Sequence, residues 1–367
     1  MKVKKICTLL SLVLTLGLFT GCSQEVATNK VEVKGAFESS APKDQNMDPM
    51  KLKAMTSALR NFYPALRSTI IIRNNKVVYE EYFKGDNIRD ELHDIQSCTK
   101  TVTAILTGIA IDKGIIKGED QKVSELLPKY INESSDERSK SLTVEHLLSG
   151  KLGKKWNEMG HPGTNDQLIA EWEREDTIKY FIDKPFDSNP GEKFTYSSMG
   201  PHMISQIISD KTGKSEAKFA EENLFKPLGI TKYEWPDKNG VSIGGHGLKI
   251  TPTDMAKIGV LILNKGKWEG KQIVSEQWIT KMTTKNSDGG MPTEEGYGYL
   301  TWLGTSHLLD VQMASGLGGQ YIFVIPKLNM VAVATSNPEI GEEVKSILDS
   351  MILPSANDVP RIPVGDM

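Results

Sequence analysis

A serine and a lysine three residues apart, Ser97 and Lys100, open an apolar segment in the first third of the chain. On a helix, positions i and i+3 lie on the same face, so the lysine amino group can reach the serine hydroxyl. A lysine beneath an apolar helix is poorly solvated, which favours its neutral, proton-accepting form. The pair could therefore be a nucleophile and its base. The plainer alternative is a helix-capping serine followed by a surface lysine.

The spacing alone does not identify a site, because Ser-x-x-Lys occurs three times in the chain. One copy, Ser40 to Lys43, lies in a polar stretch, and another, Ser215 to Lys218, lies in a charged helical pattern. Only Ser97 begins a segment, residues 97–113, that is apolar nearly all round, which predicts a buried helix. The N-terminus of such a helix offers unpaired N–H groups and positive potential where an oxyanion would form.

Two further groups of residues have types suited to the same chemistry. Tyr196 follows a Pro-Gly turn and precedes Ser197 and Ser198. Near the C-terminus, a glycine-rich sequence over residues 315–320 enters a predicted strand, and such glycines allow a ligand to approach an edge strand closely. The alternatives are a half-buried tyrosine with a satisfied hydroxyl and an ordinary hairpin turn.

The elements that must position these residues follow from the hydrophobic pattern. Apolar periodicity and turn residues predict helices and strands at both ends of the chain, with mostly helical sequence between them. A sheet built from both chain ends, with flanking helices and an inserted mainly helical lobe at about 111–229, is an α+β fold with its ligand site between the lobes. The predicted helices are 48–63, 97–113, 143–149, 167–176, 200–211, 216–225, 255–264 and 338–351, and the predicted strands are 68–73, 76–83, 311–314, 320–325 and 331–335.

Together these motifs resemble the serine β-lactamase and penicillin-binding-protein superfamily. The resemblance rests on Ser-x-x-Lys at the start of a buried helix, a tyrosine triplet about a hundred residues later and a glycine-rich strand near the end, and it spans about residues 50–350. It implies a β-lactamase/DD-peptidase-like fold with Ser97 as nucleophile and with Lys100 and Tyr196 as acid and base. It also implies an oxyanion held between the backbone N–H groups of Ser97 and Gln320.

The branch of the superfamily follows from departures in two motifs. True β-lactamases and transpeptidases carry Lys-Thr-Gly on the last strand, whereas the aligned residues here are Leu317, Gly318 and Gly319, so the basic residue is missing. Ser198 replaces the usual asparagine of the tyrosine triplet, and these four residues are expected to contact substrate. The pattern resembles the esterase and 6-aminohexanoate-dimer hydrolase group. A literal Lys-Thr-Gly at 211–213 ends a predicted helix, where its glycine is typical of a C-cap.

The expected reaction is a two-step acyl transfer on small esters or linear amides. Ser97 attacks the carbonyl, Lys100 or Tyr196 accepts its proton, Tyr196 protonates the leaving group, and water releases the acid. The alternatives are a cell-wall D-alanyl-D-alanine peptidase, a weak β-lactamase, or a penicillin-binding receptor without turnover. This mechanism implies no metal or organic cofactor. The six histidines show no metal-binding spacing. Cys98 is expected to be a small buried residue rather than a reactive thiol.

The N-terminal residues predict export and lipid anchoring. Residues 1–21 combine a basic start with a short apolar core, which is typical of a signal peptide, the alternative being a short membrane anchor. Thr20-Gly21-Cys22 resembles the bacterial lipoprotein processing site, so Cys22 is the expected lipidation site of an extracytoplasmic protein held at the membrane by its acyl chains. A tether is expected at 22–46, the hydrolase domain at 47–355 and a tail at 356–367.

The charge balance bears on the class of partner. The chain has 44 basic and 47 acidic residues, a net charge of −3, and loss of residues 1–21 would remove three more lysines. This balance gives no reason to expect a nucleic-acid partner. The sequence does not predict an oligomeric state. After processing, Cys98 would be the only thiol of the folded body, so no disulfide framework is expected.

Overall fold

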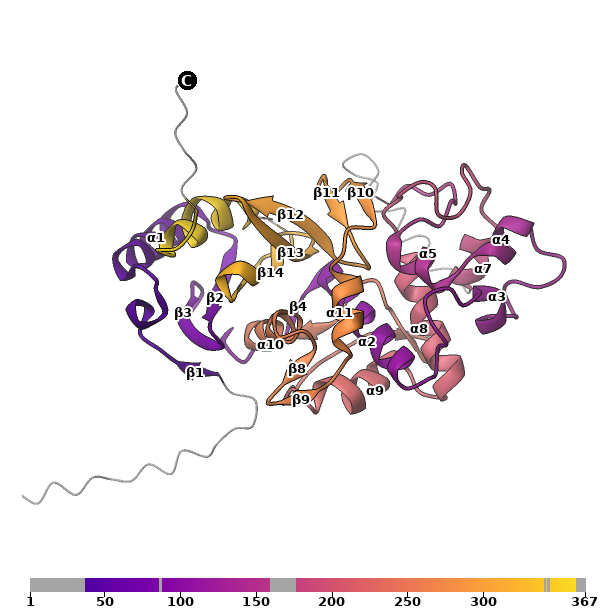
Figure 1. The fold of residues 1–367 in the computed structure, drawn as a ribbon, viewed down its shortest axis with the longest axis horizontal. Helices are drawn as coiled ribbons and strands as arrows, with labels where there is room; N and C mark the ends of the chain where they lie inside the picture. Colours follow the sequence, from indigo (N-terminus) through magenta and orange to yellow (C-terminus); the bar gives the residue numbers. More distant parts are fainter. Residues whose placement is uncertain (1–36, 86–87, 159–175, 340, 342–343, 361–367) are drawn as a thin grey trace, which may run out of the picture. The chain divides into compact units, whose positions relative to one another are not determined.

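The computed structural model describes residues 37–85, 88–158, 176–339, 341 and 344–360. Its main feature is a nine-stranded sheet of order β1-β3-β2-β15-β14-β13-β12-β11-β10, in which strands from both ends of the chain lie side by side (Figure 1). The strands of this sheet are β1 (Glu38–Ser39), β2 (Leu66–Arg73), β3 (Lys76–Tyr82), β10 (Ser287–Gly290), β11 (Glu295–Tyr297), β12 (Trp302–Ser306), β13 (Leu309–Gly316), β14 (Gln320–Ile325) and β15 (Met330–Ser336).

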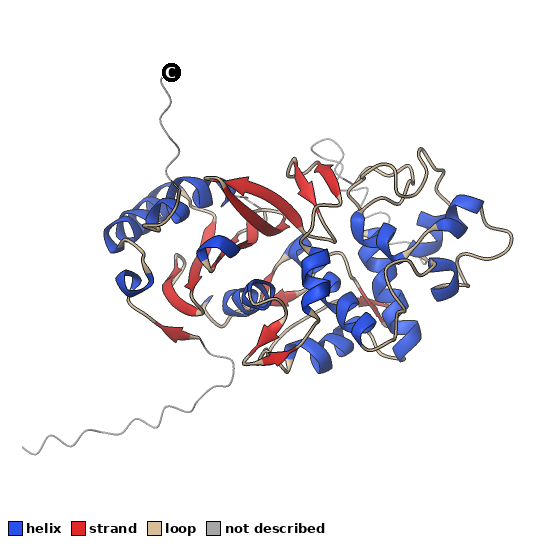
Figure 2. Ribbon diagram, viewed as in Figure 1, coloured by secondary structure: helices blue, strands red, loops and turns tan. Residues whose placement is uncertain are grey.

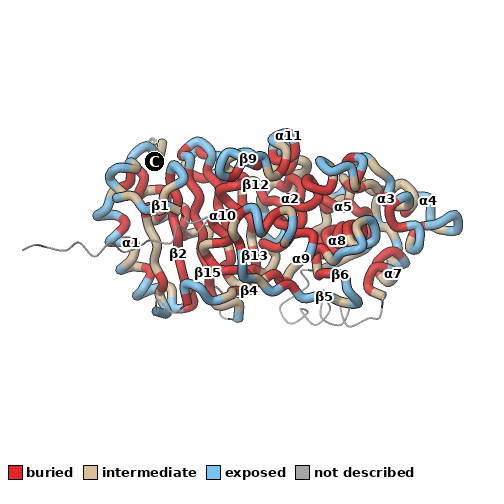
Figure 3. Tube along the Cα trace, turned by 90° about the horizontal axis from the view of Figure 1, so that it is seen from below, coloured by how far each residue is buried: buried red, intermediate tan, exposed pale blue. Residues whose placement is uncertain are grey.

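The sheet centre is formed by β2 and β15, which pair antiparallel with Ile71 opposite Ala332. Successive residues of a strand point to opposite faces, and β-branched side chains pack well there. Ile70 and Ile72 therefore enter the larger hydrophobic core, together with helix α10 (Pro252–Leu263), while Ile71 enters a second core with helix α1 (Pro49–Phe62). Both faces of the sheet are covered, which explains why β15 is buried along its whole length (Figure 3).

The remaining helices form the inserted lobe and the cover of the sheet (Figure 2). Helix α2 packs against α8, and α8 packs against α5 and α9, so the segment that carries Lys100 joins the lobe to the sheet. The helices are α1 (Pro49–Phe62), α2 (Thr99–Asp112), α3 (Val123–Leu126), α4 (Glu137–Ser141), α5 (Val144–Ser149), α7 (Thr177–Ile182), α8 (Met199–Thr212), α9 (Glu216–Ala220), α10 (Pro252–Leu263), α11 (Glu276–Met282) and α12 (Val344–Ile347), and three short two-stranded sheets pair β4 (His93–Asp94) with β7 (Lys249–Ile250), β5 (Asp237–Lys238) with β6 (Val241–Ser242) and β8 (Lys267–Trp268) with β9 (Lys271–Gln272).

The predicted α+β class, with a sheet drawn from both chain ends and a helical insertion, is confirmed. The ends of elements differ in places. Ser97 lies in a 3₁₀ turn, η3 (Gln96–Cys98), immediately before α2 rather than inside it. The predicted final helix 338–351 is shorter, with α12 followed by a π turn at Leu348–Ile352. The predicted Lys-Thr-Gly at 211–213 does end a helix, because Gly213 is the left-handed C-cap of α8.

One segment expected to be a tether belongs to the fold. Residues 37–45 contain β1, which pairs parallel with β3, and a 3₁₀ turn at Pro42–Gln45. Phe37 contacts Trp268 edge to face, with ring centroids 5.7 Å apart, so one aromatic contact and a two-residue strand attach a polar segment that shows no periodicity. The lipidation site Cys22, the rest of the predicted signal and tether, the end of the tail and most of the predicted helix 167–176 lie outside the described residues. Among the described helices, none is long and apolar enough to cross a bilayer.

Candidate active site

Ser97 lies where the sheet meets the helical lobe. The turn η3 that carries it follows β4 and contacts the β13–β14 hairpin. Gln96 adopts a left-handed conformation with φ of 51°, and its backbone N–H donates to Asp94 at 2.8 Å. At Gly316, an added Cβ would lie 2.5 Å from the Ile95 carbonyl oxygen, so only glycine allows the hairpin this close to the turn. The result is a half-buried serine between two buried elements.

Lys100 is 2% exposed and reaches back to Ser97 from the first turn of α2. Its Nζ lies 3.0 Å from Ser97 Oγ, 2.8 Å from Ser198 Oγ and 2.8 Å from the Gly245 carbonyl oxygen. Burial lowers the pKa of this lysine to about 8, although the negative charge of Glu158 opposes the shift. The predicted pair is thus in contact, and the lysine is the buried residue rather than a surface one.

Tyr196 faces the same point from the loop before α8. Its ring stacks on Trp302 with an interplanar angle of 19°, and Lys100 Nζ lies 4.7 Å from the ring centroid. The side chain is half-buried, but its hydroxyl is enclosed by protein. Burial and the charge of Glu158 raise the pKa of Tyr196 far above its usual value, although a hydrogen bond with Ser97 opposes this. The hydroxyl therefore keeps its proton at neutral pH.

Ser198 connects the lysine to a carboxylate that the motifs did not predict. Ser198 is 1% exposed, its hydroxyl donates to Glu158 Oε1 at 2.5 Å, and its backbone N–H donates to Glu158 Oε2 at 2.5 Å. Trp156 Nε1 donates to the same Oε2 at 3.1 Å. Glu158 stands 38 residues before Tyr196 in polar sequence without a motif, so nothing in the sequence pointed to it.

The glycines around Ser198 and Lys100 also have a steric reason. Gly245, whose carbonyl accepts from Lys100, packs so closely on the start of α8 that an added Cβ would lie 2.6 Å from Ser198 Cβ. Its neighbour Gly244 approaches the Pro201 carbonyl oxygen, and a Cβ there would lie 2.2 Å away. Any larger residue at either position would displace the loop that fixes the lysine.

The predicted binding residues near the C-terminus have mixed surroundings. Leu317 is 54% exposed at the tip of the β13–β14 hairpin, while Gly318 and Gly319 take left-handed conformations with φ of 76° and 97°. A Cβ at Gly318 would lie 2.3 Å from Pro338 Cα, so the turn itself requires glycine there. The hairpin reaches the nucleophile turn, since a Cβ at Gly316 would lie 3.1 Å from Gln96 Cβ. Contact of these three residues with substrate stays a prediction.

Gln320 is fully buried, and its side chain connects three strands. Its Oε1 accepts from Ser336 N at 3.0 Å and lies 2.6 Å from His93 Nε2, and its Nε2 donates to the Ser336 carbonyl at 2.8 Å. Its own carbonyl accepts from the Cys98 thiol at 3.3 Å, next to the nucleophile. These contacts fix the start of β14 beside η3. The proposed oxyanion role of its backbone N–H remains a prediction.

A hollow of about 250 Å³ opens beside Tyr196, and Gly289 and Gly290 of β10 are part of its lining. Its walls are aromatic and acidic, with Lys193 near Asp187 at 3.8 Å as its ion pair. No group of three or more His, Cys, Asp or Glu able to hold a metal occurs within the described part of the chain. The lining residues are Trp156, Asn157, Glu158, Asp187, Lys193, Phe194, Thr195, Tyr196, Gly289, Gly290 and Met291.

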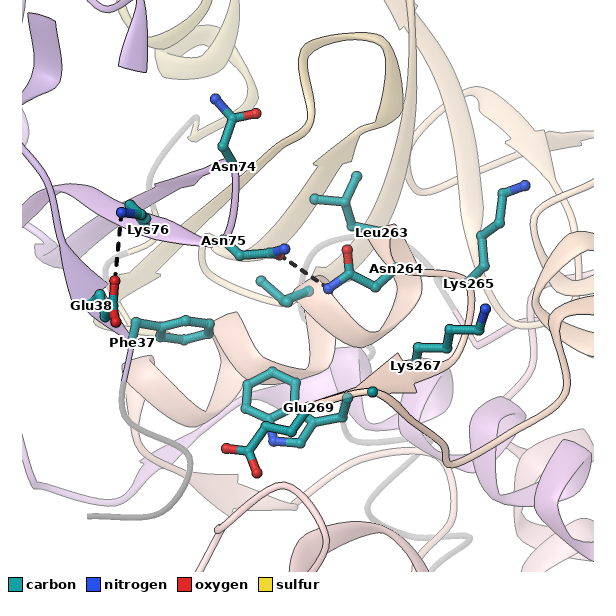
Figure 4. A pocket seen from close by; sticks show the side chains of 13 residues that line it. Phe37, Glu38, Asn74, Asn75, Lys76, Leu263, Asn264, Lys265, Lys267 and Glu269 are labelled. Carbon is teal, nitrogen blue, oxygen red and sulfur yellow. Dashed lines mark hydrogen bonds and ion pairs between the residues drawn. The ribbon is translucent and has the colours of Figure 1, made fainter. Parts of the chain in front are cut away.

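A larger groove, of about 680 Å³, lies between β1, the β2–β3 turn and the C-terminal end of α10 (Figure 4). Phe37, Trp268, Asn75, Asn264 and Lys267 are among its lining residues, and Asn264 donates to Asn75 at 3.0 Å. It contains no predicted site residue and no paired nucleophile and base. Its size therefore does not make it the active site.

Known proteins match most of this chain. The 6-aminohexanoate-dimer hydrolase of Paenarthrobacter ureafaciens is 22% identical over 309 residues, covering 78% of each chain. A Bacillus anthracis structure, of a protein proposed to be a 6-aminohexanoate-dimer hydrolase, has a TM-score of 0.73 at 19% identity and covers 90% of this chain and 91% of its own. The octameric penicillin-binding protein homologue from Pyrococcus abyssi has a TM-score of 0.64 at 20% identity, covering 85% and 79%.

A family model described as Beta-lactamase matches residues 67–348. This range includes the nucleophile turn, the helical lobe and the strands from β10 to β15. The match agrees with the resemblance drawn from the motifs, which is thereby confirmed at the level of the superfamily. Because it spans well over half of the sequence, the chain belongs to the beta-lactamase family, within the serine β-lactamases and penicillin-binding proteins.

Proposed function

We propose that this chain is a serine hydrolase that cleaves small esters or linear amides through an acyl-enzyme on Ser97. The observation that carries the proposal is the 3.0 Å distance between Ser97 Oγ and the buried Lys100 Nζ. A nucleophile within hydrogen-bond reach of a base that is fixed by other groups is the arrangement such catalysis needs. The relative from Paenarthrobacter ureafaciens is named as a hydrolase, which supports the reaction class.

We assign the base to Lys100 and the acid to Tyr196. The pKa of Lys100 is lowered to about 8, so a useful fraction of the amine is neutral near neutral pH. The pKa of Tyr196 is raised, so its phenol is a proton donor rather than a ready base. The opposite pKa shifts of these two neighbouring groups support this division of roles, which the sequence left open.

The reaction then proceeds through acylation and deacylation of Ser97. The Ser97 hydroxyl proton moves to Lys100 Nζ as Oγ forms a bond to the substrate carbonyl carbon. Collapse of the tetrahedral intermediate breaks the bond to the leaving oxygen or nitrogen, which takes the Tyr196 hydroxyl proton, and Lys100 returns a proton to the tyrosine. Water attacks the acyl-enzyme by the same route, giving the acid and free Ser97.

The preference for uncharged substrates rests on the residue at position 317. Leu317 offers no charge where related enzymes carry a basic side chain. Arg73 is buried and binds Asp358 at 2.5 Å, and Lys249 binds Glu234 at 2.8 Å, so both cations already have carboxylate partners. A substrate carboxylate would lose a charge-assisted hydrogen bond that contributes about 1.5–3 kcal/mol.

A second candidate function is cell-wall cleavage. The N-acetylmuramyl-L-alanine amidase of Bacillus subtilis is 23% identical and covers 68% of this chain and 71% of its own. The D-alanyl-D-alanine-carboxypeptidase/endopeptidase AmpH of Escherichia coli is 24% identical over 51% of this chain. These relatives favour peptidoglycan fragments as the alternative substrate class.

A turnover screen separates the candidates. The full-length protein is tested against p-nitrophenyl esters, small linear amides, D-Ala-D-Ala peptides and muramyl-L-alanine fragments, with Ser97→Ala as the blank. Turnover of esters or linear amides above the blank is the expected result. Faster turnover of a cell-wall fragment would replace the proposal with the second candidate, and acylation without turnover by any substrate would favour a receptor.

We also propose that the protein is exported and anchored to the membrane through acyl chains on Cys22. The support is the Thr20-Gly21-Cys22 sequence after a basic and then apolar start. Cells expressing wild type or Cys22→Ser are grown with a labelled fatty acid. Label and detergent partitioning should be lost in the variant, and a variant that keeps both would contradict the anchor.

A further inference from the structure

The hydrogen of the Ser198 hydroxyl is directed by the shorter of the two contacts of its oxygen. Ser198 Oγ lies 2.5 Å from Glu158 Oε1 and 2.8 Å from Lys100 Nζ. A carboxylate only accepts hydrogen bonds, and a hydroxyl has one hydrogen to give. The hydrogen therefore points to Glu158, and the Ser198 oxygen can only accept from Lys100.

The same count of hydrogens fixes the direction of each hydrogen bond of Lys100. A neutral amine has two hydrogens and one lone pair. The Gly245 carbonyl at 2.8 Å can only accept, and the Ser198 oxygen is limited to accepting by Glu158. Those two contacts use both hydrogens, so the lone pair is left for the Ser97 hydroxyl at 3.0 Å.

We propose that Glu158 is a positioning residue that sets the direction of proton transfer, by holding the Ser198 hydroxyl so that the free lone pair of Lys100 faces Ser97. This inference rests on the proposed function of Ser97 and Lys100 but concerns a residue that neither the motifs nor the family match identifies. Glu158 does not touch the nucleophile in this scheme. It acts through Ser198, and Trp156 Nε1 and the Ser198 N–H fix its second oxygen.

Replacement of Glu158 by glutamine removes one acceptor from this set. Glu158 now accepts from three donors, namely the Ser198 hydroxyl, the Ser198 N–H and Trp156 Nε1. If the amide oxygen of a glutamine takes the two N–H donors, its NH₂ group faces the Ser198 oxygen and donates to it. The Ser198 hydrogen must then turn to Lys100 and occupy the lone pair that Ser97 needs.

If Glu158 acted only through its charge, Glu158→Gln would make Lys100 a better base instead of a worse one. Its negative charge raises the pKa of Lys100 and so reduces the neutral fraction of the amine. The other titratable groups that face the lysine are Cys98, Tyr196 and His246. Burial raises the pKa of the Cys98 thiol. Burial and the charge of Lys100 lower the pKa of His246 to about 4. These three groups stay neutral near pH 7, so Glu158 supplies the nearby charge. Its loss should increase the free base, and any loss of rate must come from orientation.

The test is a double-mutant cycle on Glu158→Gln and Ser198→Ala in the full-length protein. The readout is the rate at which a fluorophosphonate probe labels Ser97 as a function of pH, which needs no knowledge of the natural substrate. In the Ser198-containing protein, Glu158→Gln should slow labelling by about a hundredfold on the high-pH plateau, as loss of a positioned base does. The midpoint of the pH profile should move to lower pH. In the Ser198→Ala background, the same substitution should change the plateau by less than about threefold, since no hydroxyl remains to turn.

Glu192→Gln is the matched control. Glu192 is an exposed carboxylate on the loop before Ser198 and accepts from Asn189, so the substitution should leave both the plateau and the midpoint unchanged. Thermal unfolding of each variant reports folding. Equal losses from Glu158→Gln in both backgrounds would overturn the proposal, as would a plateau rate at or above that of wild type.

Failure of the proposed function is visible separately. A wild type that labels at Ser97 but turns over no ester or amide contradicts the hydrolase proposal, while the labelling cycle still measures Glu158. Where an ester is turned over, a pre-steady-state burst divides acylation from deacylation. If Glu158→Gln keeps the wild-type burst rate and only accumulates acyl-enzyme, Glu158 acts on the deacylating water and the orientation proposal is wrong.

Discussion

Two lysines in this protein are equally hidden and differ in what surrounds them. Lys100 and Lys154 are each 2% exposed, and burial lowers the pKa of each to about 8. Lys154 Nζ donates to the Ile182 carbonyl at 2.5 Å and to the Lys184 carbonyl at 3.0 Å, and it lies 3.7 Å from the Phe186 ring centroid. Its remaining contact is Ser139 Oγ, at 3.4 Å.

The difference shows what makes a buried lysine a base. The two closest partners of Lys154 are carbonyl oxygens, which accept hydrogen bonds but have no proton to give. Lys100 has a hydroxyl on a tight turn at 3.0 Å, a tyrosine facing the same hydroxyl and a neighbouring hollow. A lowered pKa is shared by both sites, so geometry and access separate a candidate base from a structural lysine.

The largest expected effect separates the two serines beside these lysines. Ser97→Ala should abolish fluorophosphonate labelling, because it removes the only nucleophile proposed, whereas Ser139→Ala should label at the wild-type rate. Cys98→Ala should also label, since the Cys98 thiol is fully buried, donates to the Gln320 carbonyl and has a pKa raised by burial. Hydrolysis that survives Ser97→Ala and disappears in Cys98→Ala would reverse the assignment.

The next effect concerns the unit formed by Lys100 and Tyr196. Lys100→Ala and Tyr196→Phe should each lower kcat by about 10²–10⁴-fold, the range for loss of a positioned acid or base. The double variant should be little slower than either single one, because residues that act together do not give additive losses. The measurement is kcat on a p-nitrophenyl ester, with circular dichroism to check folding.

Lys154→Met provides the contrast for that measurement. It should lower the melting temperature, since two buried carbonyls lose their donor at about 1–3 kcal/mol for an unsatisfied group, and leave kcat per folded molecule near wild type. A Tyr196→Phe enzyme with the wild-type rate would identify Tyr196 as a structural aromatic, consistent with its stacking on Trp302.

The architecture could be predicted from the sequence because several residues in each main element carry the same signal. The runs of buried residues in β2, β14 and β15, and the surface of α2 buried from Thr99 to Ala110, each involve several consecutive positions. The strands β10 to β12 were missed because their segments are short and rich in glycine and polar residues. They depend on pairing with β13 rather than on their own periodicity.

The site was predicted only as far as its motifs reach. Ser97, Lys100, Tyr196 and Ser198 lie close together, and each belongs to a motif at a recognisable place in the chain. Contact of Ser198 with substrate stays a prediction. Glu158 could not be predicted, since its role depends on a loop that returns to the start of α8 through contacts specific to this fold. Trp302, which stacks on Tyr196, was missed for the same reason.

A smaller effect tests where positive charge is available to substrate. Leu317 carries no charge, and Lys193, the lysine that lines the hollow beside Tyr196, lies 3.8 Å from Asp187. The value of kcat/KM for a chromogenic cephalosporin should therefore be roughly ten- to a few hundred-fold below that for a neutral p-nitrophenyl ester, which corresponds to about 1.5–3 kcal/mol. Leu317→Lys should narrow this gap. A cephalosporin rate at or above the ester rate in the wild type would contradict this prediction and favour the β-lactamase interpretation.

The last comparison is a pH dependence that only one of the two lysines should control. A base must be neutral to accept the Ser97 proton, so kcat/KM should rise with pH and level off above the pKa of Lys100, near 8. Below that value the rate should fall about tenfold for each pH unit, because the neutral fraction of the amine falls by that factor. No loss from ionisation of the acid is expected up to at least pH 10, since the pKa of Tyr196 is raised by burial.

Lys154 has the same lowered pKa, so it could produce the same curve if it mattered to catalysis. Measurement of kcat/KM from pH 5.5 to 10 for wild type and Lys154→Met decides between them: an unchanged midpoint assigns the titration to Lys100, and a midpoint that moves in Lys154→Met contradicts the distinction between the two sites.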